Sequence, residues 1–103
     1  MLNTSSTPAL EFKSSTFFFF FFILFTNNIA AIEQTLHEKI NLAPEFFKDS
    51  PVIVDLRELN KQNLELDLSN IIDLLRRIGF FPVGIRGGNE HQNQQARALF
   101  IPI

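Results

Sequence analysis

The stretch DLSNIIDLLRRIGFFPVGI, residues 67–85, has the pattern of a helix that leads directly into a strand. Asp67 can cap the start of this helix, and Gly79 stands where a left-handed residue commonly ends one. Two arginines precede the glycine, at the helix end whose partial negative charge favours cations. The apolar positions follow the three- and four-residue spacing of one buried face: Leu68, Ile71, Ile72, Leu75 and Ile78. We therefore predict a helix over residues 68–78.

Strands are predicted on both sides of this helix. Residues 80–85 are apolar, with Pro82 near their start, and they form the downstream strand. Residues 52–56 form a short, mostly β-branched run between turn residues, and we expect a central strand that is buried on both faces. Residues 57–65 are polar and aperiodic, which indicates a connecting loop. Strand, helix and strand in this order predict a parallel pair joined by a helical crossover.

Nine consecutive apolar residues, Phe17–Phe25, form the most unusual segment of the chain. They are too few to cross a bilayer, which takes about 20. They also fit a secretory signal poorly, because Lys13 is the only cation before them and Glu11 offsets it. Aromatic residues favour pleated sheets, so we expect a strand covered on both faces. Residues 10–13 should form a short strand that pairs with it as a hairpin.

The remaining segments continue the alternation of helices and strands. Residues 29–43 have helical periodicity, and Pro44 ends that helix because proline disfavours helical geometry in the residue before it. Residues 45–48 can add one further turn. Residues 89–99 indicate a weakly apolar third helix, and residues 100–103 a last strand.

These elements predict an α/β fold. We expect a small two-layer domain with a mixed sheet of about five strands, an N-terminal hairpin and the order β-β-α-β-α-β-α-β. Residues 1–9 are expected to form a disordered tail, and residues 10–103 the domain itself.

Composition excludes several classes of function. The chain has 9 Lys and Arg against 11 Asp and Glu, so it lacks a general electrostatic attraction for nucleic acid or anionic lipid. It has no cysteine, which excludes disulfides, zinc–thiolate sites and thiol nucleophiles. His37 and His91 lie on different predicted helices without further ligands at metal-binding spacing, so we expect no metal site.

Residues that could carry chemistry are sparse. Asp55 ends the central strand, where open α/β sheets tend to bind ligands, but pairing with Arg57 or capping the next turn is the simpler interpretation. Gly87 and Gly88 lie between a strand and a helix, as in phosphate loops, yet the dinucleotide and P-loop spacings are absent. The conformational needs of a tight turn explain both glycines. We expect neither an enzyme nor a bound cofactor.

A family resemblance is carried by several segments in a fixed order: residues 30–36 with Glu38, Lys39 and Ile40; Ala43, Pro44, Phe46 and Phe47; residues 51–56; residues 74–79; and residues 82–88. In this order they closely resemble the N-terminal domain of the bacterial septum-site determining protein MinC, over about residues 10–103. The resemblance implies a cytoplasmic inhibitor of cell division that antagonises assembly of FtsZ, the tubulin-like division GTPase. In that family a separate glycine-rich β domain, which we do not expect within these residues, dimerises and binds the membrane-associated ATPase MinD. MinD is therefore expected as a partner only through that domain, and no direct membrane insertion is expected.

The resemblance also implies where FtsZ binds, at the end of the first helix and the turn after it. The residues that match by position are Lys39, Leu42, Ala43 and Phe46, with Lys13 as a further candidate. Two adjacent aromatic residues in one short turn cannot easily both point inward, so we expect Phe46 or Phe47 to be exposed.

Two positions depart from the family pattern. Phe18–Phe22 fill every position of a strand in which family members alternate polar and apolar residues. Phe100 stands where the family tends to have glycine, and because phenylalanine disfavours a positive φ, we expect the final turn to be built differently.

One alternative function comes from another class of protein. An anti-sigma-factor-antagonist-like regulatory domain shares the small α/β outline and acts by docking. Its phosphorylatable serine would correspond to Ser69, near the start of the second predicted helix.

Overall fold

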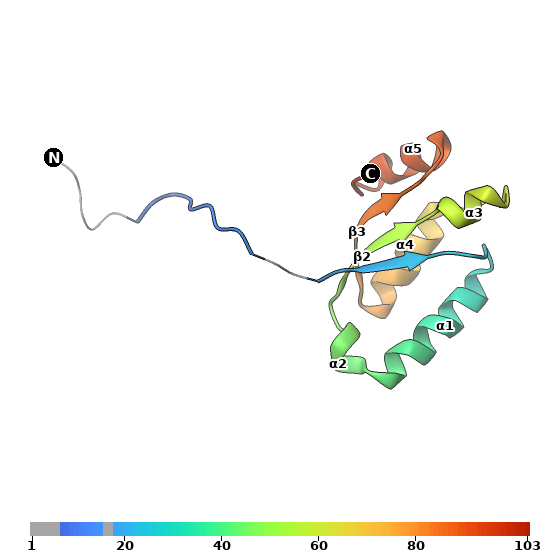
Figure 1. Cartoon of the computed structure of the whole chain (residues 1–103), viewed down its shortest axis with the longest axis horizontal. Coiled ribbons are helices and arrows are strands. Elements are labelled where there is room, and N and C mark those ends of the chain that lie inside the picture. The colour runs from blue at the N-terminus through green and yellow to red at the C-terminus, as the bar shows by residue number, and fades with distance from the viewer. Residues whose placement is uncertain (1–6, 16–17) are drawn as a thin grey trace.

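The computed structural model describes residues 7–15 and 18–103. The start of the expected tail and Phe17, the first residue of the expected phenylalanine strand, lie outside the described residues. Figure 1 shows strands and helices that alternate along the chain. They are β1 (Phe20–Ile23), α1 (Ile29–Leu42), α2 (Pro44–Phe47), β2 (Pro51–Asp55), α3 (Arg57–Lys61), α4 (Leu68–Ile78), β3 (Phe81–Arg86) and α5 (Glu90–Ala98).

The three strands form one parallel sheet in the order β1-β2-β3, with β2 at the centre. Phe21 of β1 lies opposite Ile53 of β2, and Ile53 lies opposite Gly84 of β3. A register shift interrupts the second pairing beside Ile53. Since the strands are joined by helical crossovers of one hand, α1 and α4 pack on the same face of the sheet (Figure 1). The domain therefore has two layers, one of strands and one of helices.

The helix boundaries follow from their caps. The Asp67 side chain accepts a hydrogen bond from the Ser69 N–H, and α4 ends at Gly79, whose φ is +115°. These features confirm the helix predicted over residues 68–78. Asn28 caps α1 in the same way, and Asn89 forms a reciprocal capping box with the third residue of α5.

The hydrophobic core lies between the sheet and the helix layer. The predicted stripe of α4 is buried at its first four positions, Ile78 is only partly buried, and Leu74 is buried as well. The apolar side chains with 0% exposure are Val52, Val54, Leu56, Leu59, Leu68, Ile72, Leu74 and Ala96. Because most of these residues come from β2, α3 and α4, the core is centred on the middle strand.

The predicted mixed sheet of five strands is wrong, because the sheet that residues 7–15 and 18–103 form has three strands and is entirely parallel. Residues 10–13 form no strand, and the Phe12 side chain is 92% exposed. Two alternating apolar residues are too few to hold a strand in place without a buried face. At the other end, residues 100–103 form no strand either, although the Ile85 N–H donates to the Pro102 carbonyl at 2.9 Å. The expected loop at 57–65 also contains the short helix α3.

The phenylalanine strand is shorter than expected and is not covered on both faces. β1 begins at Phe20 and ends at Ile23, and its side chains alternate between half-buried and exposed. Phe20 and Phe22 pack against the core, whereas Phe21 remains 42% exposed. One face of β1 lies against the helix layer, and the described residues form no second layer over the other.

The last turn departs from expectation at Phe100. Its φ is +59°, so this phenylalanine adopts the left-handed conformation that we expected it to avoid. The Ile101 N–H donates to the Ala96 carbonyl at 2.8 Å, which closes the end of α5, and the Ile101 side chain is buried. Phe100 itself is 93% exposed. Burial of Ile101 thus holds the turn in a conformation that glycine would adopt without strain.

Candidate functional site

The junction of α1 and α2 exposes one aromatic ring and buries much of its neighbour. Ala43 closes α1, where its N–H donates to the Ile40 carbonyl, and Pro44 begins α2. Phe47 packs against the core, whereas Phe46 is 66% exposed. The two rings meet edge to face with centroids 5.2 Å apart, and this contact limits the freedom of the exposed ring. The expectation that one of these two phenylalanines is exposed is confirmed.

Four of the five residues expected to contact a partner lie together at this junction. Leu42 is exposed at the last position of α1, one turn after the exposed Lys39. Lys39 has no ion pair with any residue that the structure describes. We call Lys39, Leu42, Ala43 and Phe46 the α1–α2 surface. It combines a charge with apolar side chains, as the centres of protein interfaces often do.

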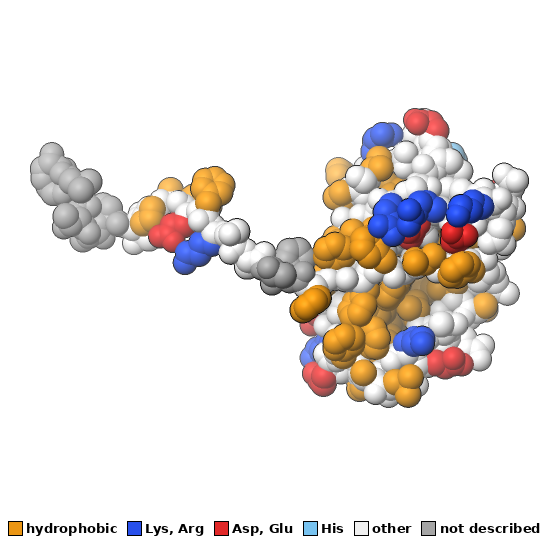
Figure 2. Space-filling view, in the orientation of Figure 1, with side chains coloured by type: hydrophobic (Ala, Val, Ile, Leu, Met, Phe, Trp, Pro, Cys, Tyr) orange, Lys and Arg blue, Asp and Glu red, His pale blue; other side chains and the backbone are white. Residues whose placement is uncertain are grey.

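Lys39 also lines a groove between β1 and α1. The groove has a volume of about 520 Å³. Apart from Lys39, its lining is uncharged, from Phe20–Thr26 on one side and from Ala31, Ile32, Thr35 and Leu36 on the other. Figure 2 shows this hollowed orange area, with blue cationic side chains on either side of it.

Lys13 is not brought to this surface. Residues 7–15 extend away from the body of the domain (Figure 1), and the Lys13 ammonium lies 3.7 Å from Glu11 of the same segment. Both side chains are mostly exposed. The structure therefore leaves the fifth candidate apart from the other four.

A second cluster lies at the carboxyl ends of β2 and β3. The Asp55 side chain is only 1% exposed, although it points to the sheet face that the helices leave open. Two guanidinium groups cover it, with Arg57 Nη2 at 2.8 Å and Arg86 Nη2 at 2.7 Å from Asp55 Oδ2. We call these three residues the arginine cluster. The hydrogen bonds from Arg57, with a further contribution from Arg86, hold the pKa of Asp55 well below its usual range despite burial.

Neighbouring residues fix the orientation of both arginines. The Arg86 guanidinium lies 4.0 Å above the centre of the Phe21 ring, a cation–π contact. Arg57 runs over Gly87, where a β carbon would come within 2.1 Å of Arg57 Cγ. Gly87 also has a φ of +71°. Its lack of a side chain thus serves the arginine cluster as well as the turn.

Sequence reasoning predicted the pairing of Asp55 with Arg57 but missed Arg86. The available signal was position, because Arg86 follows a predicted strand directly, as Asp55 does. The carboxyl ends of neighbouring parallel strands meet at the same edge of a sheet, so this pair could have been expected to meet.

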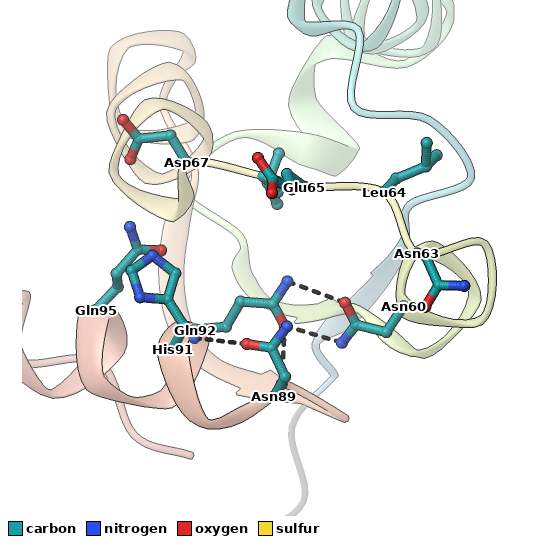
Figure 3. Close-up of a pocket in the computed structure, with 10 residues that line it drawn as sticks. Asn60, Asn63, Leu64, Glu65, Asp67, Asn89, His91, Gln92 and Gln95 are labelled. Carbon is teal, nitrogen blue, oxygen red and sulfur yellow. Dashed lines mark hydrogen bonds between the residues drawn. The ribbon is translucent and has the colours of Figure 1, made fainter.

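A polar pocket of about 820 Å³ lies beside α3 and α5. Figure 3 shows Asn60 and Gln92 side by side in its lining, where their amides exchange hydrogen bonds of 2.8 and 3.0 Å. Gln92 also accepts from the Asn89 N–H. Because these two amides bind one another, they join α3 to α5 and are not free to hold a ligand.

The other sites that the sequence suggested, at Gly87 and Gly88 and at Ser69, are involved in helix caps. The capping box occupies the Asn89 and Gln92 N–H groups at the start of α5, which weakens the case for a phosphate site at Gly87 and Gly88. The Ser69 hydroxyl donates to Asp67 at 2.7 Å, within the cap of α4. Among residues 7–15 and 18–103, no group of three or more histidine or acidic side chains could hold a metal ion. No helix in the same ranges is long and apolar enough to cross a membrane.

Comparison with known proteins identifies relatives of the chain. The family described as "Septum formation inhibitor MinC, N-terminal domain" matches residues 10–82. A "Probable septum site-determining protein MinC" of Pseudomonas aeruginosa is 32% identical over 96 residues, which cover 93% of this chain and 36% of the relative. The protein of the same name from Pseudoalteromonas translucida is 33% identical, over 90% of this chain and 39% of the relative. That of Buchnera aphidicola is 37% identical, over 76% and 31%.

The chain thus spans between about a third and two fifths of the length of these relatives. The family match covers most of the chain, including the α1–α2 surface and β2. On this evidence of sequence and position, the chain belongs to the MinC N-terminal domain family, a family of cell division and division-site selection.

Proposed function

We propose that this chain is an inhibitory module of cell division that binds FtsZ and antagonises assembly of its filaments. The family match over residues 10–82 carries the proposal. This match favours the division function over the anti-sigma-factor-antagonist alternative. No observed feature of Ser69 supports that alternative. The proposed contact is the α1–α2 surface.

The physical case for this contact rests on Phe46 and Lys39. Phe46 is an exposed ring held against Phe47 and Phe20, with a centroid separation of 5.4 Å from the latter. An aromatic side chain that is already ordered loses little entropy when a partner covers it, which suits an interface anchor. Lys39, which has no ion pair among the described residues, offers a cation to an acidic site on the partner. Charge pairs of this kind direct encounter and orientation more than they raise affinity.

The test is a GTP-driven FtsZ assembly assay in which polymer is sedimented. The folded domain should reduce sedimentable FtsZ. Lys39→Glu should raise the dose required about tenfold, because it removes a cation and adds a repulsion. Phe46→Ala should raise it by at least as much if the ring is an anchor.

Matched controls separate contact from folding. Arg77→Glu reverses an exposed charge on α4 that is not part of the α1–α2 surface, and should leave the dose unchanged. His91→Ala on α5 should do the same. Far-ultraviolet circular dichroism of each variant checks that the helices are retained. The proposal fails if the folded wild-type chain leaves FtsZ sedimentation unchanged at a clear molar excess.

Further aspects of the function follow from the same family assignment. We infer that the chain acts in the cytoplasm as a binding module, without catalysis, and that nucleic acid is not its partner. Contact with MinD is expected only through the separate β domain of full-length relatives. Adding MinD and ATP to the FtsZ assay should therefore leave the effect of this chain unchanged.

A further inference from the structure

The face of the sheet opposite the helix layer is uncovered and largely apolar. Parallel sheets usually have both faces covered, so an open apolar face on one suggests a surface that a partner covers. In the described part of the chain no element packs over this face. We call it the open sheet face; its exposed or half-exposed members are Phe21, Ile23, Ile53, Phe81 and Val83.

The arginine cluster lies on this same face. Ile23, Asp55 and Arg86 are opposite one another in the strand register, so their side chains point to the same side of the sheet. Arg57 and Arg86 are 55% and 41% exposed, whereas the carboxylate between them is buried. Two cations and one anion leave one net positive charge at the surface. In a chain with a formal charge of −2, this is a local reversal of sign.

Both arginines are ordered and still have capacity to bind. Each uses Nε and Nη2 to bind Asp55, and neither Nη1 donates to any residue in the described part of the chain. A guanidinium held in this way is preorganised for a further carboxylate, because little side-chain freedom remains to be lost. The adjacent Phe21 and Ile23 would contact apolar groups beside that carboxylate.

We propose that the arginine cluster and the adjoining open sheet face bind an acidic segment of the partner, with a carboxylate on Arg57 and Arg86 and apolar side chains against Phe21 and Ile23. This inference rests on the proposed function, since it adds a second contact to the same FtsZ complex. The apolar floor favours a protein segment over nucleic acid, whose phosphates would meet mostly hydrocarbon here. Figure 2 shows the combination, with blue side chains directly beside the orange area.

A set of three variants tests the cluster in the FtsZ sedimentation assay. The double variant Arg57→Gln with Arg86→Gln removes both charges and retains amide donors toward Asp55. It should raise the required dose about tenfold if the cations bind the partner. The double variant Arg57→Lys with Arg86→Lys keeps both cations on the same positions, so it should recover much of the inhibition that the glutamine variant loses. Arg77→Gln removes one exposed charge elsewhere and should match the wild type.

The opposite pattern overturns the inference. If the double variant inhibits as well as the wild type, the cluster serves only to join β2 to β3. The same conclusion follows if the folded lysine variant loses inhibition as strongly as the glutamine variant, because the loss would then not depend on the two charges. If the wild type itself leaves FtsZ unchanged, the proposed function fails first, and that result is distinct from a variant effect.

A footprint on the wild-type chain keeps the test open if a variant does not fold. Phenylglyoxal modifies accessible guanidinium groups, and mass spectrometry measures the extent at each arginine. Bound FtsZ should slow modification of Arg57 and Arg86 at least several-fold while Arg77 reacts as before. Equal rates with and without FtsZ would overturn the inference, as would protection by a single-stranded oligonucleotide in place of FtsZ.

Discussion

Replacement of Asp55 by asparagine should be the most informative single test of how this domain is held together. The wild-type carboxylate accepts six hydrogen bonds from Arg57 and Arg86 while being almost fully buried. Asparagine retains one acceptor oxygen and turns an NH₂ group toward two cations. Breaking a buried ion pair by removing one partner typically costs about 3–5 kcal/mol.

The expected loss here is smaller than that range. Both guanidinium groups are about half exposed and can return to water when the carboxylate is removed. We therefore expect the free energy of unfolding to fall by about 2–3 kcal/mol. For a domain of this size, each kcal/mol lowers the melting temperature by about 4–8 °C.

Urea denaturation followed by circular dichroism at 222 nm measures this loss. Asp73→Asn is the matched control, because Asp73 is exposed on α4, and it should change stability by less than about 0.5 kcal/mol. The wild-type domain is expected to have about 5–15 kcal/mol of stability, so Asp55→Asn should remain folded at room temperature. If the two variants are equally stable, Asp55 does not stabilise the join of β2 and β3, and the reasoning is wrong.

The other predictions concern pH and backbone strain. Because the pKa of Asp55 is lower in the folded state, the ionised carboxylate contributes its full stabilisation of the fold above the ordinary pKa of 3.8 and loses that contribution as the pH falls below 3.8. Between about pH 5 and pH 2, the urea midpoint should therefore fall less steeply for Asp55→Asn than for the wild type. Gly87→Ala should lower stability by about 1–3 kcal/mol and displace Arg57, since both the positive φ and the close approach of Arg57 Cγ oppose a β carbon; a spectrum that matches the wild type together with an unchanged urea midpoint would contradict this. Phe100→Gly should raise stability by about 1 kcal/mol, because it relieves a left-handed phenylalanine that is almost fully exposed, and a lower melting temperature would show that the ring has a packing role.

Local signals predicted the helices well. Helix α4 carries a cap, a periodic apolar stripe and a left-handed glycine, and its bounds agree with the prediction. Helix α1 ends one residue before the predicted limit, because Ala43 serves both as its C-cap and as the N-cap of α2. These features depend on residues within a few positions of each other, which is why a sequence reveals them.

The sheet was predicted less well because strand pairing is not local. The alternation of Leu10 and Phe12 suggested a strand, yet no described strand accepts this segment, and both side chains are exposed. Helix α3 was missed for a related reason. Its five residues are polar except for Leu59, and burial of that one side chain fixes the turn against the core. A single apolar residue has no periodicity to detect.

The site was predicted in two unequal parts. Four residues of the α1–α2 surface came from position matches to the family, and the structure places them at one helix junction. Arg86 was not predicted, since its contact with Asp55 spans 31 positions. Composition gave no signal for the arginine cluster either, because a formal charge of −2 does not indicate a local positive charge.

Phe21 links the two proposed contacts physically. Its ring lies beneath Arg86, and the residue is also among those that line the β1–α1 groove, which extends to Lys39. A partner that bridges Lys39 and Arg86 would have to cross the phenylalanine strand and bury it. Such burial offers a reason for exposed phenylalanines on β1 that folding of the isolated domain does not supply. Phe21→Thr should then weaken FtsZ inhibition more than Val83→Thr, which changes the same open sheet face away from the groove. If the two substitutions change the FtsZ dose equally, one partner does not bridge the α1–α2 surface and the arginine cluster through Phe21. The arginine cluster would then be tested only by the variants of Arg57 and Arg86.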